Sequence, residues 1–227
     1  MPTTVAHRAC RLSAWGLIVV LAGGCANIPP MPWDEPDVVP GIVPPGERVA
    51  ELRKLRADAG RASAEHKELV VAGLAEQIVQ ETDASLRAEI VRTLAVYPTD
   101  QSKRILRHAL EDVDRHVRIA ACEAWGKIPH PEAVSLLGET LQADTDIDVR
   151  LAAAKALGRT RDSQAAAALA PALADADPAM QYRATLSLRQ VTGKNFGTIA
   201  AWRQYLHQAN TPESRPAAVA DRPWDAY

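Results

Sequence analysis

Three histidines and one cysteine lie close together in the middle of the chain, and both residue types bind metal ions. They are His108, His116, Cys122 and His130. Zinc sites draw their ligands from short spacings such as Cys-x-x-Cys or His-Glu-x-x-His, and neither spacing occurs in this sequence. His116 and Cys122 are six residues apart, so they do not share one face of a helix. The sequence therefore predicts no metal site and no bound cofactor.

An Asp–Arg pair that recurs four residues apart is the most regular ionisable pattern. Its members are Asp83 with Arg87, Asp114 with Arg118, and Asp146 with Arg150. Because the pair recurs with the repeat described next, we interpret it as a structural ladder that links neighbouring repeats by charge-assisted hydrogen bonds. A functional anion site is the alternative. The last repeat has Gln181 in place of the arginine, as expected for a terminal unit.

The elements that position these residues follow from four similar segments, which begin at Glu81, Asp112, Asp144 and Asp175. They read ETDASLR, DVDRHVR, DTDIDVR and DADPAMQ, at offsets of 31, 32 and 31 residues. Self-similarity at this period is typical of a solenoid, in which each unit buries its apolar side against its neighbours. The second acidic residue of each segment, always an aspartate, suits a helix N-cap. The pattern therefore predicts one helix after each segment.

Each of these helices has three apolar positions spaced by four residues on one face. The expected core columns are Leu86, Val117, Val149 and Met180; Ile90, Ala121, Ala153 and Ala184; and Leu94, Trp125, Leu157 and Leu188. Gly126 and Gly158 follow as expected C-caps. A second helix completes each unit, at 100–111, 131–141 and 163–174. A leading pair is expected at 47–59 and 64–80.

The N-terminus has the pattern of a secretory signal. Arg8 and Arg11 precede a short apolar run at 12–21, and small residues then lead to Cys25. The run is shorter than the roughly 20 residues that a transmembrane helix needs. We therefore predict a signal peptide over residues 1–24.

Residues 21–25, LAGGC, resemble the lipobox of bacterial lipoproteins. The resemblance implies cleavage before Cys25, acylation of its thiol and of the new amine, and a lipid anchor in the bacterial cell envelope with the folded part in the periplasm. Family lipoboxes prefer Leu where this chain has Ala22, so signal cleavage without lipidation is the alternative. In the same family an Asp after the cysteine favours the inner membrane. Ala26 stands there in this chain, which favours the outer membrane.

The remaining chain divides by composition into three parts. Residues 25–46 are a Pro-rich membrane-proximal linker, with seven prolines between 26 and 46, and we expect an extended spacer there. Residues 47–207 form the repeat array, and residues 208–227 are expected to be a disordered tail. Without residues 1–24 the chain has 24 basic and 28 acidic side chains. This balance and the lack of a basic stripe predict no nucleic-acid binding.

The pattern DxDxxVRxAAxxALG at 144–158, repeated at 112–126, resembles the HEAT-like repeat of the phycobilisome-lyase type. The resemblance extends from Ala64 to Thr192. The segment 192–206 is similar to a closing element of bacterial HEAT-repeat proteins. It implies an all-α fold, a short right-handed α-solenoid of HEAT-like helix pairs, in which the second helices line a concave binding surface. The pattern is specific for the fold and nearly silent on function.

The best partner-binding candidates are polar residues on the second helices. They are Arg104, Arg107, His108, Ser135, Glu139, Glu76 and Gln77. We expect a protein-binding scaffold, with another protein as partner and an unknown oligomeric state. A lyase- or chaperone-like protein that acts on a bound cofactor or client is the alternative. The sequence has no convergent acid, base and nucleophile, so we do not expect an enzyme.

Overall fold

The computed structural model describes residues 43–209, which lie within one compact unit, Val43–Tyr227. The described residues form helices and connecting loops without any strand. The expected all-α fold is therefore confirmed. The predicted signal peptide, Cys25, the linker up to residue 42 and the tail from residue 210 lie outside the described residues, so these remain predictions.

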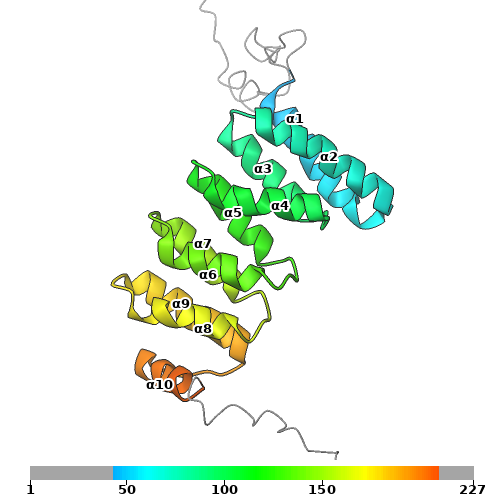
Figure 1. The fold of residues 1–227 in the computed structure, drawn as a ribbon. Helices are drawn as coiled ribbons and strands as arrows, with labels where there is room; N and C mark the ends of the chain where they lie inside the picture. The colour runs from blue at the N-terminus through cyan, green and yellow to red at the C-terminus, as the bar shows by residue number, and fades with distance from the viewer. Residues whose placement is uncertain (1–42, 210–227) are drawn as a thin grey trace, which may run out of the picture. The chain divides into compact units, whose positions relative to one another are not determined.

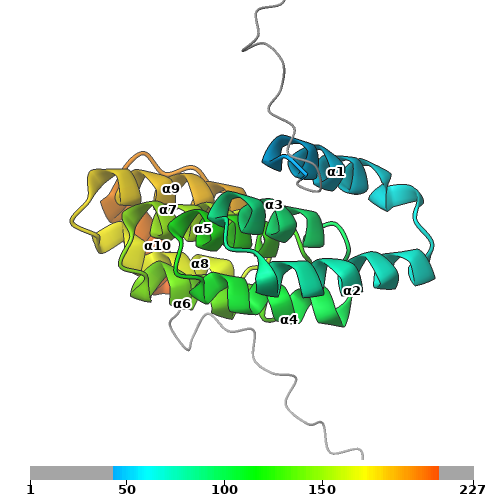
Figure 2. The ribbon, with the colours of Figure 1, turned by 90° about the horizontal axis from the view of Figure 1, so that it is seen from above.

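Within residues 43–209, ten α-helices follow one another in pairs and stack in two layers (Figures 1 and 2). The first helices of the pairs are α1 (Pro45–Asp58), α3 (Ala84–Leu94), α5 (Arg115–Trp125), α7 (Ile147–Leu157) and α9 (Pro178–Thr192). The second helices are α2 (Ala64–Gln80), α4 (Asp100–His108), α6 (Ala133–Ala143), α8 (Ala165–Leu169) and α10 (Ile199–Ala209). Short 3₁₀ turns follow α1, α4 and α8, at Ala59–Arg61, Ala109–Glu111 and Ala170–Ala174. The array of helix pairs is the predicted α-solenoid.

The repeated aspartates start the first helices, as the sequence predicted. The side chains of Asp83, Asp114, Asp146 and Asp177 each accept a hydrogen bond from the backbone amide two residues further on, at 2.7–2.8 Å. Each bond satisfies one of the amides that a helix start leaves without an intrahelical partner. Pro178 takes the first position of α9, where a missing amide costs nothing.

The three predicted core columns are buried in every repeat. Their twelve side chains are at most 2% exposed, and Trp125 and Leu157 are fully buried. The α1–α2 pair continues the core, because Leu52 is buried and the Tyr97 hydroxyl donates to the Leu55 carbonyl at 2.6 Å. The other end is closed by Trp202 of α10, which is fully buried and packs edge-on against Phe196 at a ring distance of 4.8 Å.

Several helix boundaries differ from the prediction: α6 is shifted by two residues from the expected 131–141, and the expected helix at 100–111 ends as a 3₁₀ turn over Ala109–Glu111. Two further boundaries differ because of proline. α1 begins at Pro45, inside the stretch expected to be extended, because the first turn of a helix tolerates proline. The second helix of the third unit is α-helical only over Ala165–Leu169 and continues as a 3₁₀ turn that contains Pro171. Pro171 lacks the amide that an α-helix interior requires.

Gly126 and Gly158 are C-caps in position, but the reason for glycine differs from the expected one. Both have right-handed backbone angles, whereas the left-handed cap occurs at Gly193, with φ 68°. A Cβ on Gly126 would lie 2.9 Å from Cα of Ala156, and one on Gly158 would lie 2.9 Å from Cα of Ser187. The two glycines therefore allow successive first helices to approach closely.

Candidate interaction surface

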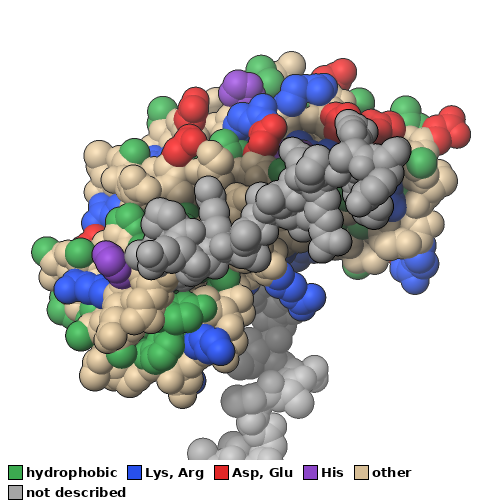
Figure 3. All heavy atoms as spheres, turned by 60° about the horizontal axis from the view of Figure 1, so that its bottom comes forward, with side chains coloured by type: hydrophobic (Ala, Val, Ile, Leu, Met, Phe, Trp, Pro, Cys, Tyr) green, Lys and Arg blue, Asp and Glu red, His purple; other side chains and the backbone are tan. Residues whose placement is uncertain are grey.

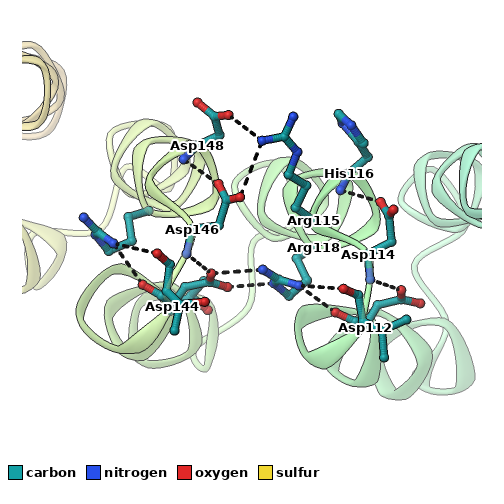
Figure 4. Close-up of polar contacts among 12 residues, drawn as sticks. Asp112, Asp114, Arg115, His116, Arg118, Asp144, Asp146 and Asp148 are labelled. Carbon is teal, nitrogen blue, oxygen red and sulfur yellow. Dashed lines mark hydrogen bonds and ion pairs between the residues drawn. The ribbon is translucent and has the colours of Figure 1, made fainter.

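The arginine ladder joins neighbouring repeats at the starts of the first helices (Figure 4). Nε and Nη2 of Arg118 donate to the two carboxylate oxygens of Asp144 at 2.8 and 3.1 Å. Nη1 of the same side chain donates to the backbone carbonyls of Asp112 and Val113 at 2.9 and 3.3 Å. One guanidinium thus ties the loop before its own helix to the loop before the next first helix.

The same geometry recurs one repeat earlier, and its acidic partners differ from those we expected. Arg87 donates to both carboxylate oxygens of Asp112 at 2.9 and 3.0 Å. The partner is thus the first acidic residue of the next segment, 25 residues away, and not the aspartate four residues earlier. Asp83 and Asp114 instead cap their helices, because their side chains face the free amides of the first turn.

The ladder ends at the third repeat. Arg150 donates to the carbonyls of Asp144 and Thr145 at 3.1 and 3.5 Å, but it has no ion pair within residues 43–209. Gln181 keeps only the backbone contact, donating to the Asp175 carbonyl at 2.7 Å. Asp146 caps α7 and also lies 3.6 Å from Nη1 of Arg115. These contacts give the ladder a structural role.

Electrostatics at the ladder favour the charged forms. Burial would raise the pKa of Asp112, but hydrogen bonds from Arg87 and from the Asp114 amide lower that pKa on balance. The hydrogen bond to Asp144 raises the pKa of Arg118. In the Arg87–Asp112 and Arg118–Asp144 pairs both charges are therefore satisfied within the protein, which leaves these two arginines unavailable to an external anion.

The His and Cys residues of the middle repeat differ in their exposure to solvent. Burial raises the pKa of the Cys122 thiol to about 12, and its side chain is packed in the core. His108 and His116 are exposed, while His130 packs edge-on against Trp125 at 5.8 Å. Within residues 43–209 no group of three or more His, Cys, Asp or Glu side chains is placed to hold a metal ion.

The predicted partner-binding residues lie on the second-helix layer, in three places. Arg104, Arg107 and His108 are exposed on α4, Ser135 and Glu139 on α6, and Glu76 on α2, where Gln77 is half-buried. Arg107 forms an ion pair with Glu132 of the next unit. The Ser135 hydroxyl donates to Glu139 at 2.9 Å. In the upper part of the surface view in Figure 3, Lys and Arg side chains are interspersed with acidic and uncharged ones.

An open groove of about 880 Å³ crosses the second-helix layer between α6 and α8 and brings together only Ser135 and Glu139 of the predicted set. We call it the α6–α8 groove. Its lining is Pro131, Val134, Ser135, Gly138, Glu139, Gln142, Ser163, Gln164, Ala166, Ala167, Ala168 and Leu206. Glu139 is the one ionisable side chain in this lining. The α4 residues and α2 residues lie outside it.

The remaining groove residues were not predicted as a site, although one signal pointed to them. A run of alanines occupies residues 165–168, and three of them, Ala166, Ala167 and Ala168, form a wall of the groove. Leu206 could not be assigned from the pattern, because it comes from α10 and reaches the groove only through the folding of the last pair.

A family model for HEAT repeats matches this chain over residues 71–150 and 134–220. The chain belongs to the HEAT-repeat family. Comparison with curated protein sequences gives no match. The HEAT units found in this way overlap the helix pairs from α2 onward. HEAT repeats form helical scaffolds for protein interaction, which agrees with a broad groove that contains a single ionisable side chain.

Proposed function

We propose that this HEAT-repeat protein is a lipid-anchored lipoprotein of the bacterial envelope that holds another protein in its α6–α8 groove. The folded array acts as a rigid platform, and the partner is a protein segment that fits between two second helices. The function is binding and not catalysis. The lipid at Cys25 would keep the platform at the membrane and raise the local concentration of the partner there.

The α6–α8 groove is the observation that carries this proposal. Three of its residues, Ala166, Ala167 and Ala168, have side chains that end at Cβ, and Gly138 has none. Small side chains let the backbone of a partner helix approach closely, and this increases the number of favourable dispersion contacts. The carboxylate of Glu139 already accepts a hydrogen bond from Ser135. We therefore expect a largely uncharged partner segment, because Glu139 is the one ionisable side chain in the lining and the rest of the groove offers no charge for a charged segment to pair with.

The groove lining lacks the groups that an enzyme would need, and this favours binding over catalysis. A hydrolase or lyase requires an acid, a base or a nucleophile that converge on one reacting atom. The groove offers Ser135, but the one ionisable group in the groove lining is the carboxylate of Glu139, which the Ser135 hydroxyl already contacts. No histidine and no lysine line the groove.

The membrane anchor rests on the N-terminal sequence alone. No helix within residues 43–209 is long and apolar enough to cross a membrane. Attachment through acyl chains needs no such helix, since each buried methylene contributes about 0.8 kcal/mol. The lipobox-like LAGGC at residues 21–25 supports attachment at Cys25.

Site-specific photo-crosslinking in envelope membranes tests the groove. A photoreactive amino acid at Ser135 is expected to give a discrete adduct with one partner protein. Ala167→Arg places a long cation in the groove and should abolish this adduct. Ala50→Arg is the matched control, because Ala50 is exposed on α1, away from the groove.

Two outcomes would contradict the proposed function. An adduct from Ser135 that survives Ala167→Arg would mean that the partner does not occupy the groove. Equal loss in both arginine variants would assign the effect to the added charge and not to its place. Circular dichroism of both variants checks that the array is folded.

A further inference from the structure

Charge is distributed unevenly along the described part of the chain. Residues 43–177 contain 18 Lys and Arg against 22 Asp and Glu, whereas residues 178–209 contain four Lys and Arg and no acidic residue. With neutral histidines, the last helix pair therefore has a net charge of +4 and the preceding array a net charge of −4. A sign change of this kind within one solenoid indicates a surface for an anionic partner.

Three of the four cations surround one hollow. Arg183 and Arg189 of α9 and Lys194 of the following loop line an open hollow of about 470 Å³. Within residues 43–209 none of the three forms an ion pair. The fourth cation, Arg203, is occupied, because it donates to the Leu173 carbonyl at 2.7 Å. The hollow thus gathers three cations that no acidic side chain neutralises.

An apolar strip adjoins this basic hollow. Ile119, Leu151 and Tyr182 occupy the same position in three successive first helices, directly after Arg118, Arg150 and Gln181. They line a second hollow of about 340 Å³, to which Arg183 also contributes. Tyr182 is 64% exposed. Arg183 therefore belongs to both hollows and makes them one continuous surface.

The charged groups around the strip are also mainly basic. The second hollow includes Lys155, which has no ion pair within residues 43–209, and Glu123, which lies 3.9 Å from Arg92. We call the combined surface the C-terminal basic face. It consists of Ile119, Leu151, Lys155, Tyr182, Arg183, Arg189 and Lys194. It lies on the first-helix layer, whereas the α6–α8 groove lies on the second-helix layer (Figure 2).

We infer that the C-terminal basic face docks on a membrane surface of anionic phospholipid. Lys and Arg side chains near such a surface are attracted to its headgroups. Tyrosine and aliphatic side chains gain by entering the boundary between headgroups and acyl chains. A free phosphate would use the cations but leave the exposed Tyr182 and its aliphatic neighbours without a role. A lipid surface uses both parts of the face.

This inference deepens the proposed function, because it gives the anchored array an orientation at the membrane. Its biological setting rests on that proposed function. The first-helix layer of α9 would face the lipid, and the α6–α8 groove on the other layer would face away from it. Docking through the protein surface does not depend on the lipid at Cys25. It can therefore be measured separately from the anchor and from the groove.

Vesicle flotation of the full-length chain with Cys25→Ser tests the inference. We expect tighter binding to vesicles of phosphatidylcholine with phosphatidylglycerol than to vesicles of phosphatidylcholine alone. Each cation near an anionic surface contributes enough to change affinity about fivefold. Arg183→Gln with Arg189→Gln should therefore weaken binding to the anionic vesicles about 25-fold. All variants have the same N-terminal sequence, so a difference in their vesicle binding reports on the substituted side chains.

The matched control is Arg53→Gln with Lys54→Gln, two exposed cations of α1 that have no ion pair within residues 43–209. It changes the net charge by the same amount and should leave vesicle binding unchanged. If the α9 variant does not fold, Lys194→Gln in the loop replaces it, with an expected loss of about fivefold.

Three results would overturn the inference. The first is equal binding to both kinds of vesicle by the Cys25→Ser chain that has no substitution in the C-terminal basic face. The second is equal loss in the α9 and α1 variants, which would reflect net charge alone. The third is vesicle binding that is unaffected by the α9 variant while retention on immobilised polyglutamate is lost, which would assign the face to acidic proteins. None of these results depends on the crosslink from Ser135, so the groove and the basic face can fail independently.

Discussion

Replacing Gly126 by alanine tests the close approach of first helices that builds this array. The added methyl group would lie 2.9 Å from both Cα and Cβ of Ala156 and 3.0 Å from its carbonyl oxygen. Carbon atoms in contact normally lie about 3.5–4.0 Å apart. The obstacle is the backbone of α7, so a side-chain rotation cannot relieve it. We therefore expect α5 and α7 to separate locally.

The magnitude follows from two opposing effects. Overpacking of this kind costs about 1–3 kcal/mol. The backbone of Gly126 has φ −68°, which alanine adopts without strain, so restriction of the unfolded chain returns about 0.4–1 kcal/mol. Because the obstacle is backbone, the cost lies in the upper half of the overpacking range, about 2–3 kcal/mol, and the net loss in unfolding free energy is about 1–2 kcal/mol. For a domain of this size the Tm should fall by about 2–8 °C.

Thermal melting followed by circular dichroism measures this effect, and two other glycines of the chain serve as controls. A Cβ at Gly73 would meet no atom within 4 Å, and one at Gly138 would lie 3.5 Å from Cβ of Ala168, which is ordinary contact. Both are inside helices, so Gly73→Ala and Gly138→Ala should raise stability by about 0.5–1 kcal/mol. A Gly126→Ala protein as stable as the original, or a Gly73→Ala protein equally destabilised, would refute the reasoning.

Three further predictions concern the carboxyl group of Asp112 and the thiols of Cys122 and Cys25. Because the pKa of Asp112 is lowered in the folded state, its pairing with Arg87 contributes stability above the ordinary Asp pKa, and this contribution is lost as pH falls through the lowered value. The Asp112→Asn variant should accordingly lose less stability than the original chain on acidification. A difference in Tm between the two proteins that stays the same at every pH would contradict this. Maleimide labelling with peptide mapping should leave Cys122 unmodified in the native state, because burial raises its pKa to about 12, and rapid labelling without denaturant would show that the core opens. Cys25→Ser should release the protein from membranes into the soluble periplasmic fraction, and its persistence in membranes would remove the lipid anchor.

The repeat architecture could be predicted because its signals are local. An aspartate that caps a helix acts on an amide two residues away, and a buried column follows from the period of one helix. Two of the boundaries that were wrong, at Pro45 and Pro171, involve a residue whose effect depends on its place within a turn. Proline is accepted in the first turn and breaks the α-helical bonding further on.

The candidate site was predicted only in part, because a groove is made by several units at once. Ser135 and Glu139 could be assigned to an exposed helix face from spacing alone. The contribution of Leu206 depends on how α10 packs after the last pair. The α4 cations were expected to join the same surface, but Arg107 pairs with Glu132 of the next unit and lies outside the groove.

The amino-acid sequence by itself determined that this protein is a stack of paired helices, since caps and apolar columns are set by residues within one turn or one repeat of each other. Tertiary structure alone decided which groups meet between repeats. Arg118 lies four residues from Asp114 in the sequence, but it bonds to Asp144 because the stacking of α5 on α7 brings that carboxylate within 2.8 Å. Glycine is likewise needed at position 126 because Ala156 lies against it in space, and no spacing along the chain identifies this neighbour.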